Sequence, residues 1–187
     1  HDEVANGKAR LPEEVDPGRA DSCFAKKKSC LGAALVFTSP GIPMIFQGQE
    51  FLEDDWFHDQ DPVDWTKKDR FKGILALYKR LIHLRLDRDK VTAGLAAANI
   101  DVYHVNQNDK VISYHRWRNG GEGDSVVIIA NFSNGTFMGY EIGLPHGGRW
   151  KVRLNSDHKR YDEQFGDLDC PDVDAVQKGR DGLDFTG

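Results

Sequence analysis

Two short polar clusters carry most of the side chains that could take part in catalysis. The first is the pair His1 and Asp2, and the second is the segment 47–50, in which Gln47 and Glu50 directly follow an apolar run. Imidazole and carboxylate groups transfer protons and stabilise charge in active sites. A His-Asp pair alone also occurs often by chance, so the elements that would position it decide its meaning.

The first half of the chain has the pattern of a parallel α/β fold. Residues 9–20 show no periodicity and predict a loop, whereas helical spacing of apolar residues predicts helices over residues 21–36 and from about 66 to 88. Between these helices, the short apolar run 42–46 predicts a buried parallel strand. The first predicted helix places four apolar side chains on one side: Phe24, Leu31, Ala34 and Leu35.

The order loop, helix, strand, helix is the repeating unit of such folds. Their active sites lie at the C-terminal ends of the strands. Gln47 and Glu50 follow the predicted strand, while His1 and Asp2 precede a long loop and a helix, as the tip of a preceding strand would. Both clusters therefore fit the expected position of an active site.

The second half of the chain predicts an antiparallel sheet. Turn signals separate runs rich in β-branched and aromatic residues, which cover residues 100–105, 111–117, 125–132, 137–142 and 150–154. The expected fold class is therefore α/β followed by all-β, with a sandwich-like second part and a division into residues 1–90 and 91–187. Beyond residue 157 no final strand is evident, so we expect the second domain to be incomplete.

Composition narrows the classes of ligand. The net charge is -5, and no sustained basic stripe is present, which argues against nucleic acid. No apolar run approaches the roughly 18 residues that span a bilayer, so no membrane partner is expected. The run Lys26–Lys28 is expected to form a solvated helix face. With no signal or transit peptide visible and no disulfide spacing, we expect a reducing compartment, either cytoplasmic or plastid-like.

Four segments, in order, resemble the α-amylase superfamily of glycoside hydrolases. His1-Asp2-Glu3-Val4 with Gly7-Lys8 is similar to the fourth short motif of that family, in the form typical of 1,4-α-glucan branching enzymes. Residues 41–51 resemble its eighth barrel strand and tip, and Asp64-Trp65 resembles the entry to its last barrel helix. Residues 111–134 look like the first strands of its C-terminal β-domain. The ordered set spans about residues 1–155 and is more specific than any one motif.

This resemblance implies the last quarter of a (β/α)8 barrel followed by a β-domain. The family cleaves α-1,4-glucosidic bonds with retention, using a carboxylate nucleophile, a Glu acid/base and an Asp that stabilises the transition state. Only the last role maps onto this chain, to Asp2, with His1 binding the same sugar. The other two carboxylates would lie upstream, so the isolated chain is expected to be inactive. The implied partner is a neutral α-glucan, starch or glycogen, with no cofactor and no metal.

Other residues near the implied site leave alternatives open. Glu50 could orient the strand tip, together with Gln47, or be a surface acid. Trp56 could stack on a glucose ring or pin its loop, and pinning is favoured for Trp65. Two departures from the branching pattern, at Ala5-Asn6 and at Phe46-Gln47, leave transfer and hydrolysis undecided. The alternatives are therefore an α-amylase-type hydrolase and a noncatalytic glucan-binding module.

Overall fold

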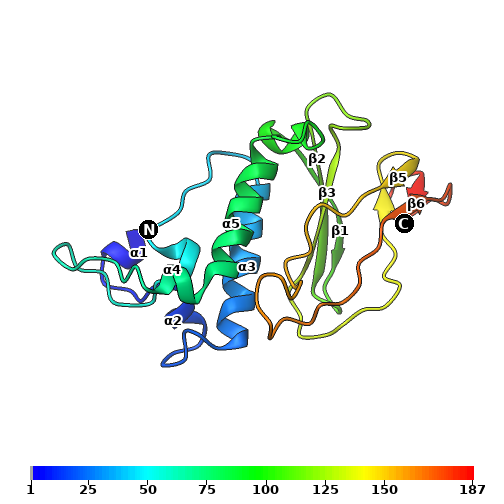
Figure 1. The fold of residues 1–187 in the computed structure, drawn as a ribbon. Coiled ribbons are helices and arrows are strands. Elements are labelled where there is room, and N and C mark those ends of the chain that lie inside the picture. The colour runs from blue at the N-terminus through cyan, green and yellow to red at the C-terminus, as the bar shows by residue number, and fades with distance from the viewer. Residues whose placement is uncertain (1) are drawn as a thin grey trace. The chain divides into compact units, whose positions relative to one another are not determined.

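The two long helices of the first half are α3 (Cys23–Thr38) and α5 (Lys72–Arg85), drawn in blue and green in Figure 1. The structure is a computed structural model that describes residues 2–187. Both predicted helices are confirmed, although a separate short helix, α4 (Lys67–Arg70), precedes α5. Side chains of α3 and α5, together with four from other segments, form an apolar core: Cys30, Ala33, Phe37, Leu52, Phe71, Ile74, Leu77, Tyr78, Leu81, Tyr161 and Phe165.

The predicted apolar side of the first helix is wrong. Phe24 is 45% exposed, and the buried face instead carries Ser29, Cys30 and Ala33 together with Lys26. The Lys26 ammonium donates to Asp162 Oδ2 at 2.6 Å and to Gln164 Oε1 at 2.7 Å, so it is not part of a solvated face. Its partners lie more than 130 positions away, which is why helical spacing alone does not reveal them.

Contacts divide the chain into two units. Unit 1 takes in the described residues up to Phe37, residues 42–82 and residues 154–169. Unit 2 takes in residues 38–41, 83–153 and 170–187. The domain division predicted between residues 90 and 91 stays a prediction.

The strand predicted at residues 42–46 is absent from the described part of unit 1. These residues are irregular, and Ile42 and Met44 are 97% and 56% exposed. A strand needs a hydrogen-bonded neighbour, and every strand pair of residues 2–187 is antiparallel and lies in unit 2. The barrel therefore stays a prediction. The remaining helices of unit 1 are short: α1 (Asp2–Ala5), α2 (Leu11–Val15) and the 3-10 helix η1 (Gln49–Phe51).

Unit 2 contains the predicted antiparallel sheet. Strands β1 (Asn99–Asn106), β2 (Val111–Trp117) and β3 (Val126–Asn131) pair in the order β1-β2-β3. Val102 pairs with Tyr114, and Tyr114 pairs with Ile128 on the other side. A short 3-10 helix, η2 (Ala93–Ala96), precedes the sheet. The strands predicted over residues 100–105, 111–117 and 125–132 are thus confirmed.

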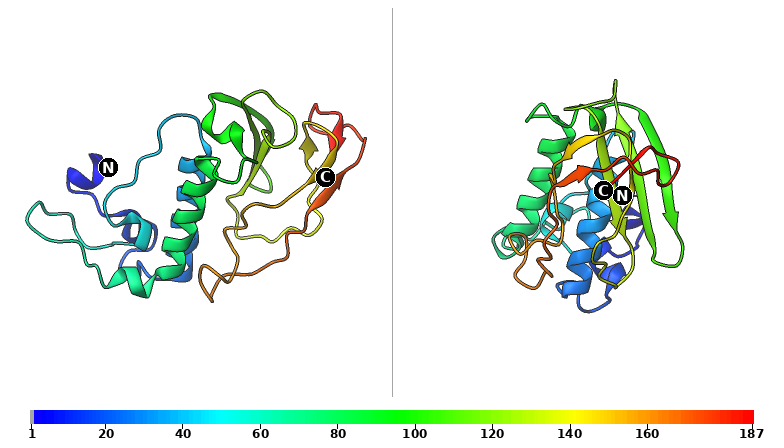
Figure 2. Two further views of the ribbon diagram at one scale, coloured as in Figure 1. Left: turned by 45° about the horizontal axis from the view of Figure 1, so that its top comes forward. Right: turned by 90° about the vertical axis from the view of Figure 1, so that its right-hand side faces the viewer.

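Two smaller ladders complete unit 2 and correct the remaining predictions. Strand β4 (Gly143–Leu144) pairs with β7 (Phe185–Thr186), and β5 (Gly148–Trp150) pairs with β6 (Val173–Ala175). Figure 2 shows the C-terminal part of the chain that contains these ladders in yellow to red. The strands predicted over residues 137–142 and 150–154 are wrong, because the first segment is irregular and only Trp150 of the second lies in a strand. The expectation of no final strand is also wrong, since β7 lies at residues 185–186.

A buried guanidinium group organises the loops beside this sheet. Arg116 of β2 is 0% exposed and donates to the carbonyl oxygens of Asn99 at 2.8 Å and Leu95 at 3.3 Å, and also to those of Thr38 and Ala97. These carbonyls belong to the start of β1, to η2 and the residue after it, and to the end of α3, and a carbonyl turned away from water needs a hydrogen-bond donor. One side chain thus joins four backbone positions of unit 2.

Candidate functional site

Asp2 lies in the short helix α1 and is exposed. The helix closes with Asn6 N–H donating to Asp2 O at 2.9 Å, and Gly7 comes next with a φ of +92°, a conformation that favours glycine. His1, the predicted sugar-binding residue, lies outside the described residues. The predicted catalytic carboxylate is therefore on the surface, on a segment whose position depends on how the next residues are held.

Arg10 fixes that segment to the loops around Gln47 and Asp55. Its side chain is 6% exposed, and it donates from Nη1 to Gln47 O at 2.6 Å and from Nε to Asp55 O at 2.8 Å. Its guanidinium also lies 5.0 Å from the centroid of the Phe46 ring. Burial lowers the pKa of Arg10, and the nearby carboxylates, led by Glu53, oppose that shift. Arg10 thus brings three separate segments of unit 1 together.

Trp56 lies on the surface beside the N-terminal segment. It is 61% exposed, and a Cβ atom built on Gly7 would lie 4.0 Å from its Cζ2 atom. Trp56 lines a hollow of about 220 Å³ whose other walls are Arg10, Glu53, Asp55, His58, Asp61, Pro62 and Val63. An exposed indole beside carboxylates can stack on a sugar face while the polar groups bind the sugar hydroxyls.

The other predicted residues occupy different positions. Gln47 contributes its backbone carbonyl to the contact with Arg10. Glu50 is half-buried in η1, and its Oε2 atom has no hydrogen-bond partner among residues 2–187. Trp65 is 66% exposed and its ring lies 5.5 Å from that of Phe51. The roles predicted for these side chains stay predictions.

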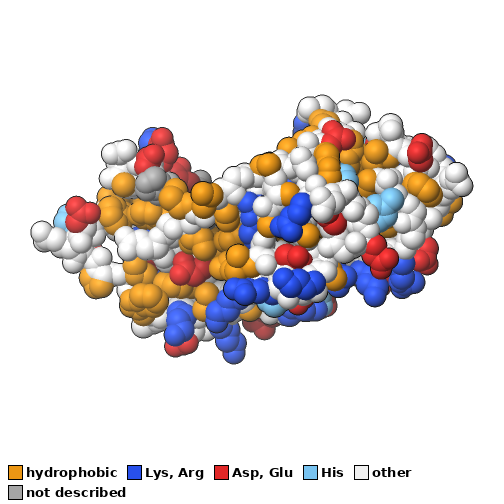
Figure 3. Space-filling model, turned by 90° about the horizontal axis from the view of Figure 1, so that it is seen from above, with side chains coloured by type: hydrophobic (Ala, Val, Ile, Leu, Met, Phe, Trp, Pro, Cys, Tyr) orange, Lys and Arg blue, Asp and Glu red, His pale blue; other side chains and the backbone are white. Residues whose placement is uncertain are grey.

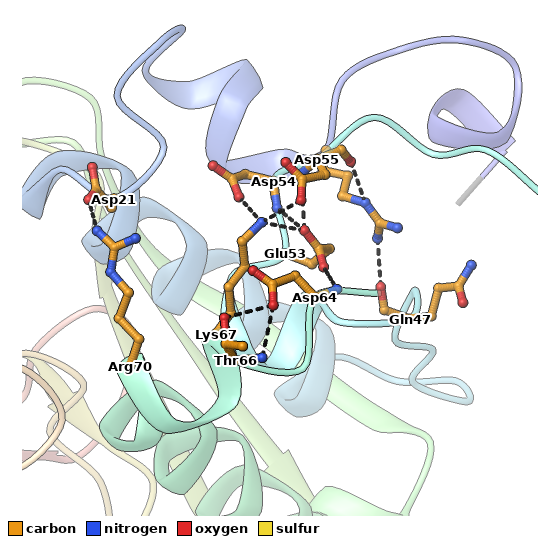
Figure 4. A network of polar contacts seen from close by, with 10 residues as sticks. Asp21, Gln47, Glu53, Asp54, Asp55, Asp64, Thr66, Lys67 and Arg70 are labelled. Atoms are coloured by element: carbon orange, nitrogen blue, oxygen red, sulfur yellow. Dashed lines mark hydrogen bonds and ion pairs between the residues drawn. The ribbon is translucent and has the colours of Figure 1, made fainter. Parts of the chain in front are cut away.

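A buried carboxylate, Glu53, holds the loop that carries Trp56 (Figure 4). Glu53 is 1% exposed and accepts backbone N–H groups of Asp54 at 3.0 Å, Asp55 at 3.1 Å and Asp64 at 2.8 Å. It also accepts the Lys67 ammonium at 2.5 Å. Burial opposes its ionisation, but the hydrogen bonds from Lys67 and the backbone outweigh it and lower the pKa of Glu53.

Lys67 is the cation at the centre of this cluster. Besides Glu53, its Nζ atom contacts Asp54 and, at 3.0 Å, Asp55. Burial disfavours its charge, but the three carboxylates prevail and raise the pKa of Lys67. Oxygens of these carboxylates lie within 4.8 Å of one another, a spacing that could suit a hard metal ion. In this chain the charge they surround is that of Lys67.

Sequence reasoning missed Arg10, Glu53 and Lys67. The partners of Arg10 lie 37 and 45 positions away, and Lys67 lies 14 positions from Glu53. The acidic composition of residues 51–65 was the only signal, because periodicity does not show which charge meets which.

Comparison with known proteins shows which family part of this chain resembles. Residues 102–186 match the family described as "Alpha amylase, C-terminal all-beta domain". The resemblance to the α-amylase superfamily is thereby confirmed, and unit 2 contains most of the matched residues.

Curated relatives of similar sequence share one enzyme name. The chain is 32% identical over 171 residues to the 1,4-alpha-glucan branching enzymes GlgB of Bacillus cereus (strain AH820) and Bacillus anthracis. The match covers 86% of this chain and 25% of each relative, so the chain spans about a quarter of their length. A pullulanase structure from Anoxybacillus sp. LM18-11 has a TM-score of 0.60 at 20% identity, covering 95% of this chain and 25% of that one.

A second structure of that pullulanase, complexed with maltotetraose, has a TM-score of 0.55 at 22% identity and covers 79% of this chain and 23% of that one. At sequence identities of 20% and 22%, the likeness to these structures is a likeness of fold alone.

Among residues 2–187, no helix is both long and apolar enough to cross a membrane.

Proposed function

We propose that this chain is the C-terminal part of a retaining α-glucan-processing enzyme, and specifically of a 1,4-α-glucan branching enzyme acting on starch or glycogen. The observation that carries this proposal is the 32% identity over 171 residues to proteins with that name. The motif around Asp2 and the acidic net charge, which suits a neutral polymer, support it.

In this proposal residues 1–90 complete a (β/α)8 barrel and residues 91–187 form the C-terminal β-domain. Ile42 and Met44 are the apolar side chains that a barrel strand would bury, and both are exposed in the chain alone. Figure 3 shows hydrophobic side chains gathered on the N-terminal part of the molecule, where partner segments would cover them. Large exposed apolar patches commonly mark such surfaces.

Asp2 would act without forming a bond to the substrate. Retaining enzymes break the glycosidic bond through an oxocarbenium-like transition state and a covalent glycosyl-enzyme intermediate. A carboxylate that grips hydroxyls of the reacting sugar favours the positive charge that develops at its anomeric carbon. His1 would bind the same sugar, and Trp56 would stack on a neighbouring one. The nucleophile and the acid/base would come from upstream segments, so the chain alone would not catalyse the reaction.

Two alternatives use the same residues. An α-amylase-type hydrolase would pass the same intermediate to water instead of a sugar hydroxyl. A noncatalytic glucan-binding module would lack the two upstream carboxylates altogether.

The test is to express the complete reading frame and analyse its products on amylose. New α-1,6 branch points without a net gain of reducing ends are the expected result. Accumulating reducing ends would show the hydrolase instead, and amylose binding without any product would show the module. Full activity of the isolated 187-residue chain would contradict the division of catalytic residues proposed above.

A further inference from the structure

Lys67 lies just after the loop 53–65, and its ammonium group contacts the three carboxylates at the start of that loop. We infer that Lys67 is a positioning residue, whose ammonium group holds Glu53, Asp54 and Asp55 so that Trp56 is presented beside the N-terminal segment. This inference rests on the proposed function, because it takes Trp56 as a residue that contacts glucan.

The contacts join the two ends of the loop. Glu53 accepts the N–H of Asp64, eleven positions later, and the ammonium group of Lys67 reaches the carboxylates of residues 53–55. Lys67 is 9% exposed, and Glu53 is 1% exposed. A hydrogen-bonded ion pair sheltered from water is screened less than one on the surface. The two ends of the loop are therefore held together by contacts of Glu53 and Lys67, because residues 53–65 form no β-strand.

Trp56 depends on this closure because it comes directly after Asp55. Two groups hold the backbone at Asp55: its N–H donates to Glu53, and its carbonyl accepts from Arg10. Trp56 itself lies outside the helices and strands and is 61% exposed. Removing the Lys67 ammonium would leave three converging carboxylates to repel one another, and the backbone at Asp55 would move away from Arg10.

A merely structural ion pair would affect unfolding without affecting ligand binding. A positioning role predicts instead that Lys67 acts on the substrate only through Trp56. The two roles are separated by a double-mutant cycle, because two residues that act through one contact do not have additive effects.

The experiment measures kcat and KM on amylose for the complete reading frame carrying Lys67→Met, Trp56→Ala or both. Each single variant is expected to raise KM about ten-fold, with kcat within about three-fold, as for the loss of one uniform binding contact. The double variant is expected to match Trp56→Ala. Lys68→Met, which removes the same charge from the exposed neighbouring residue, is expected to leave KM unchanged.

An unchanged KM in Lys67→Met, or additive effects in the double variant, would overturn the inference. If Lys67→Met does not fold, Glu53→Gln combined with Lys67→Met removes the buried charge together with its partner and takes its place in the cycle.

A second readout does not depend on the reaction. Amide hydrogen exchange in the same protein should become at least about ten-fold faster at Asp54, Asp55 and Asp64 in Lys67→Met, but not in Lys68→Met, because local opening sets the exchange rate. If the protein does not act on amylose, the proposed function fails and this measurement alone decides whether Lys67 orders the loop. Unchanged exchange would refute the ordering role.

Discussion

The two units hold their irregular segments by different means. Within residues 2–187, all strands lie in unit 2, where backbone pairing fixes the register and Arg116 donates to four backbone carbonyls. Unit 1 has helices and loops, and its loops are held by charged side chains that reach across the sequence: Arg10, Lys26 and Lys67. Backbone pairing thus orders the strands of unit 2, whereas long-range contacts of charged side chains hold the loops of unit 1.

This difference predicts where substitutions act. A loop held by a few ion pairs can be tuned by single residues, and Trp56, which is proposed to contact substrate, lies on such a loop in unit 1. The backbone ladders of unit 2 offer stability instead. Functional residues commonly occur on loops supported by a rigid scaffold. Changes at the substrate-facing positions of unit 1 should therefore affect activity more than stability, and changes in the sheet of unit 2 the reverse.

The largest effect is expected from Asp2→Asn in the complete reading frame. The amide keeps the size of the side chain but loses the charge that would stabilise the transition state, so kcat should fall by about 10²–10³-fold. Asp2 is exposed, and unfolding should be unchanged. Initial rates on amylose and a urea unfolding curve measure the two effects. The control is Glu3→Gln, which neutralises the next exposed carboxylate, and an equal loss in both variants would show that Asp2 has no special role.

Arg116→Met should produce the opposite pattern. The carbonyl groups of Asn99, Leu95, Ala97 and Thr38 would lose their shared donor, and unit 2 should lose about 3 kcal/mol of stability. The measurement is amide exchange of strand β2 under native conditions. Arg118→Met, on an exposed residue of the same chain segment, should change little. Unchanged amide exchange in β2 together with a large loss of activity would contradict the division of roles between the units.

Gly73→Ala tests the packing of unit 1. A Cβ atom at Gly73 would lie 2.0 Å from Tyr161 O, so helix α5 and the segment around Tyr161 would have to separate. Overpacking of this kind costs about 1–3 kcal/mol. Amide exchange in α5 should accelerate, while exchange in β2 should not. Faster exchange in both would show that the two units unfold together.

Local patterns in the sequence predict some elements of the fold well, whereas elements that depend on distant partners are predicted poorly. Helix α5 was predicted because its apolar residues share one face, and Ile74, Tyr78 and Leu81 are indeed buried. Strand β2 was predicted because β-branched and aromatic residues stand between turn signals. Both signals are local, so a single segment contains all the information needed to predict it.

Predictions that required a distant partner did less well. The apolar run 42–46 indicates burial, but a strand also needs a neighbour, and residues 2–187 supply none for it. Lys26 stands in a basic run, and only Asp162 explains its burial. At the candidate site, Asp2 and Trp56 stood out by residue type and motif. Glu53 and Lys67 did not, because charged residues in an acidic loop normally face water.

Acid should weaken both units through buried carboxylates. Glu53 in unit 1 and Asp124 in unit 2 both have a lowered pKa, although burial opposes the ionisation of each. Lys67 and backbone N–H groups stabilise the charged form of Glu53. The backbone N–H groups of residues 118–120 stabilise the charged form of Asp124. A lowered pKa gives stability that is present above the unfolded value and is lost as pH falls through the folded one. The loss should therefore begin near pH 4.5 for Glu53 and near pH 3.8 for Asp124.

The check is the unfolding free energy of each unit between about pH 6 and pH 3, compared with Glu53→Gln and Asp124→Asn. Each substitution should flatten the pH dependence of its own unit only. A variant that retains the full acid dependence of its unit would show that the named carboxylate is not responsible.

The smallest effect, and the only gain, is expected from Gly32→Ala. Gly32 lies inside helix α3 without a positive φ, and its added Cβ would meet Leu11 Cδ2 at 3.7 Å, an ordinary contact. Because alanine restricts the unfolded chain and favours helix, unit 1 should gain about 0.5–1 kcal/mol. The same substitution at Gly120 of unit 2 meets open space but a φ of +86°, and should cost about 1 kcal/mol. The measurement is amide hydrogen exchange, which should be slower in α3 of Gly32→Ala and faster around the Gly120 turn of Gly120→Ala. This result would show that the backbone conformation of the glycine, and not the space around it, decides whether alanine stabilises or destabilises the unit. Equal signs would contradict that account.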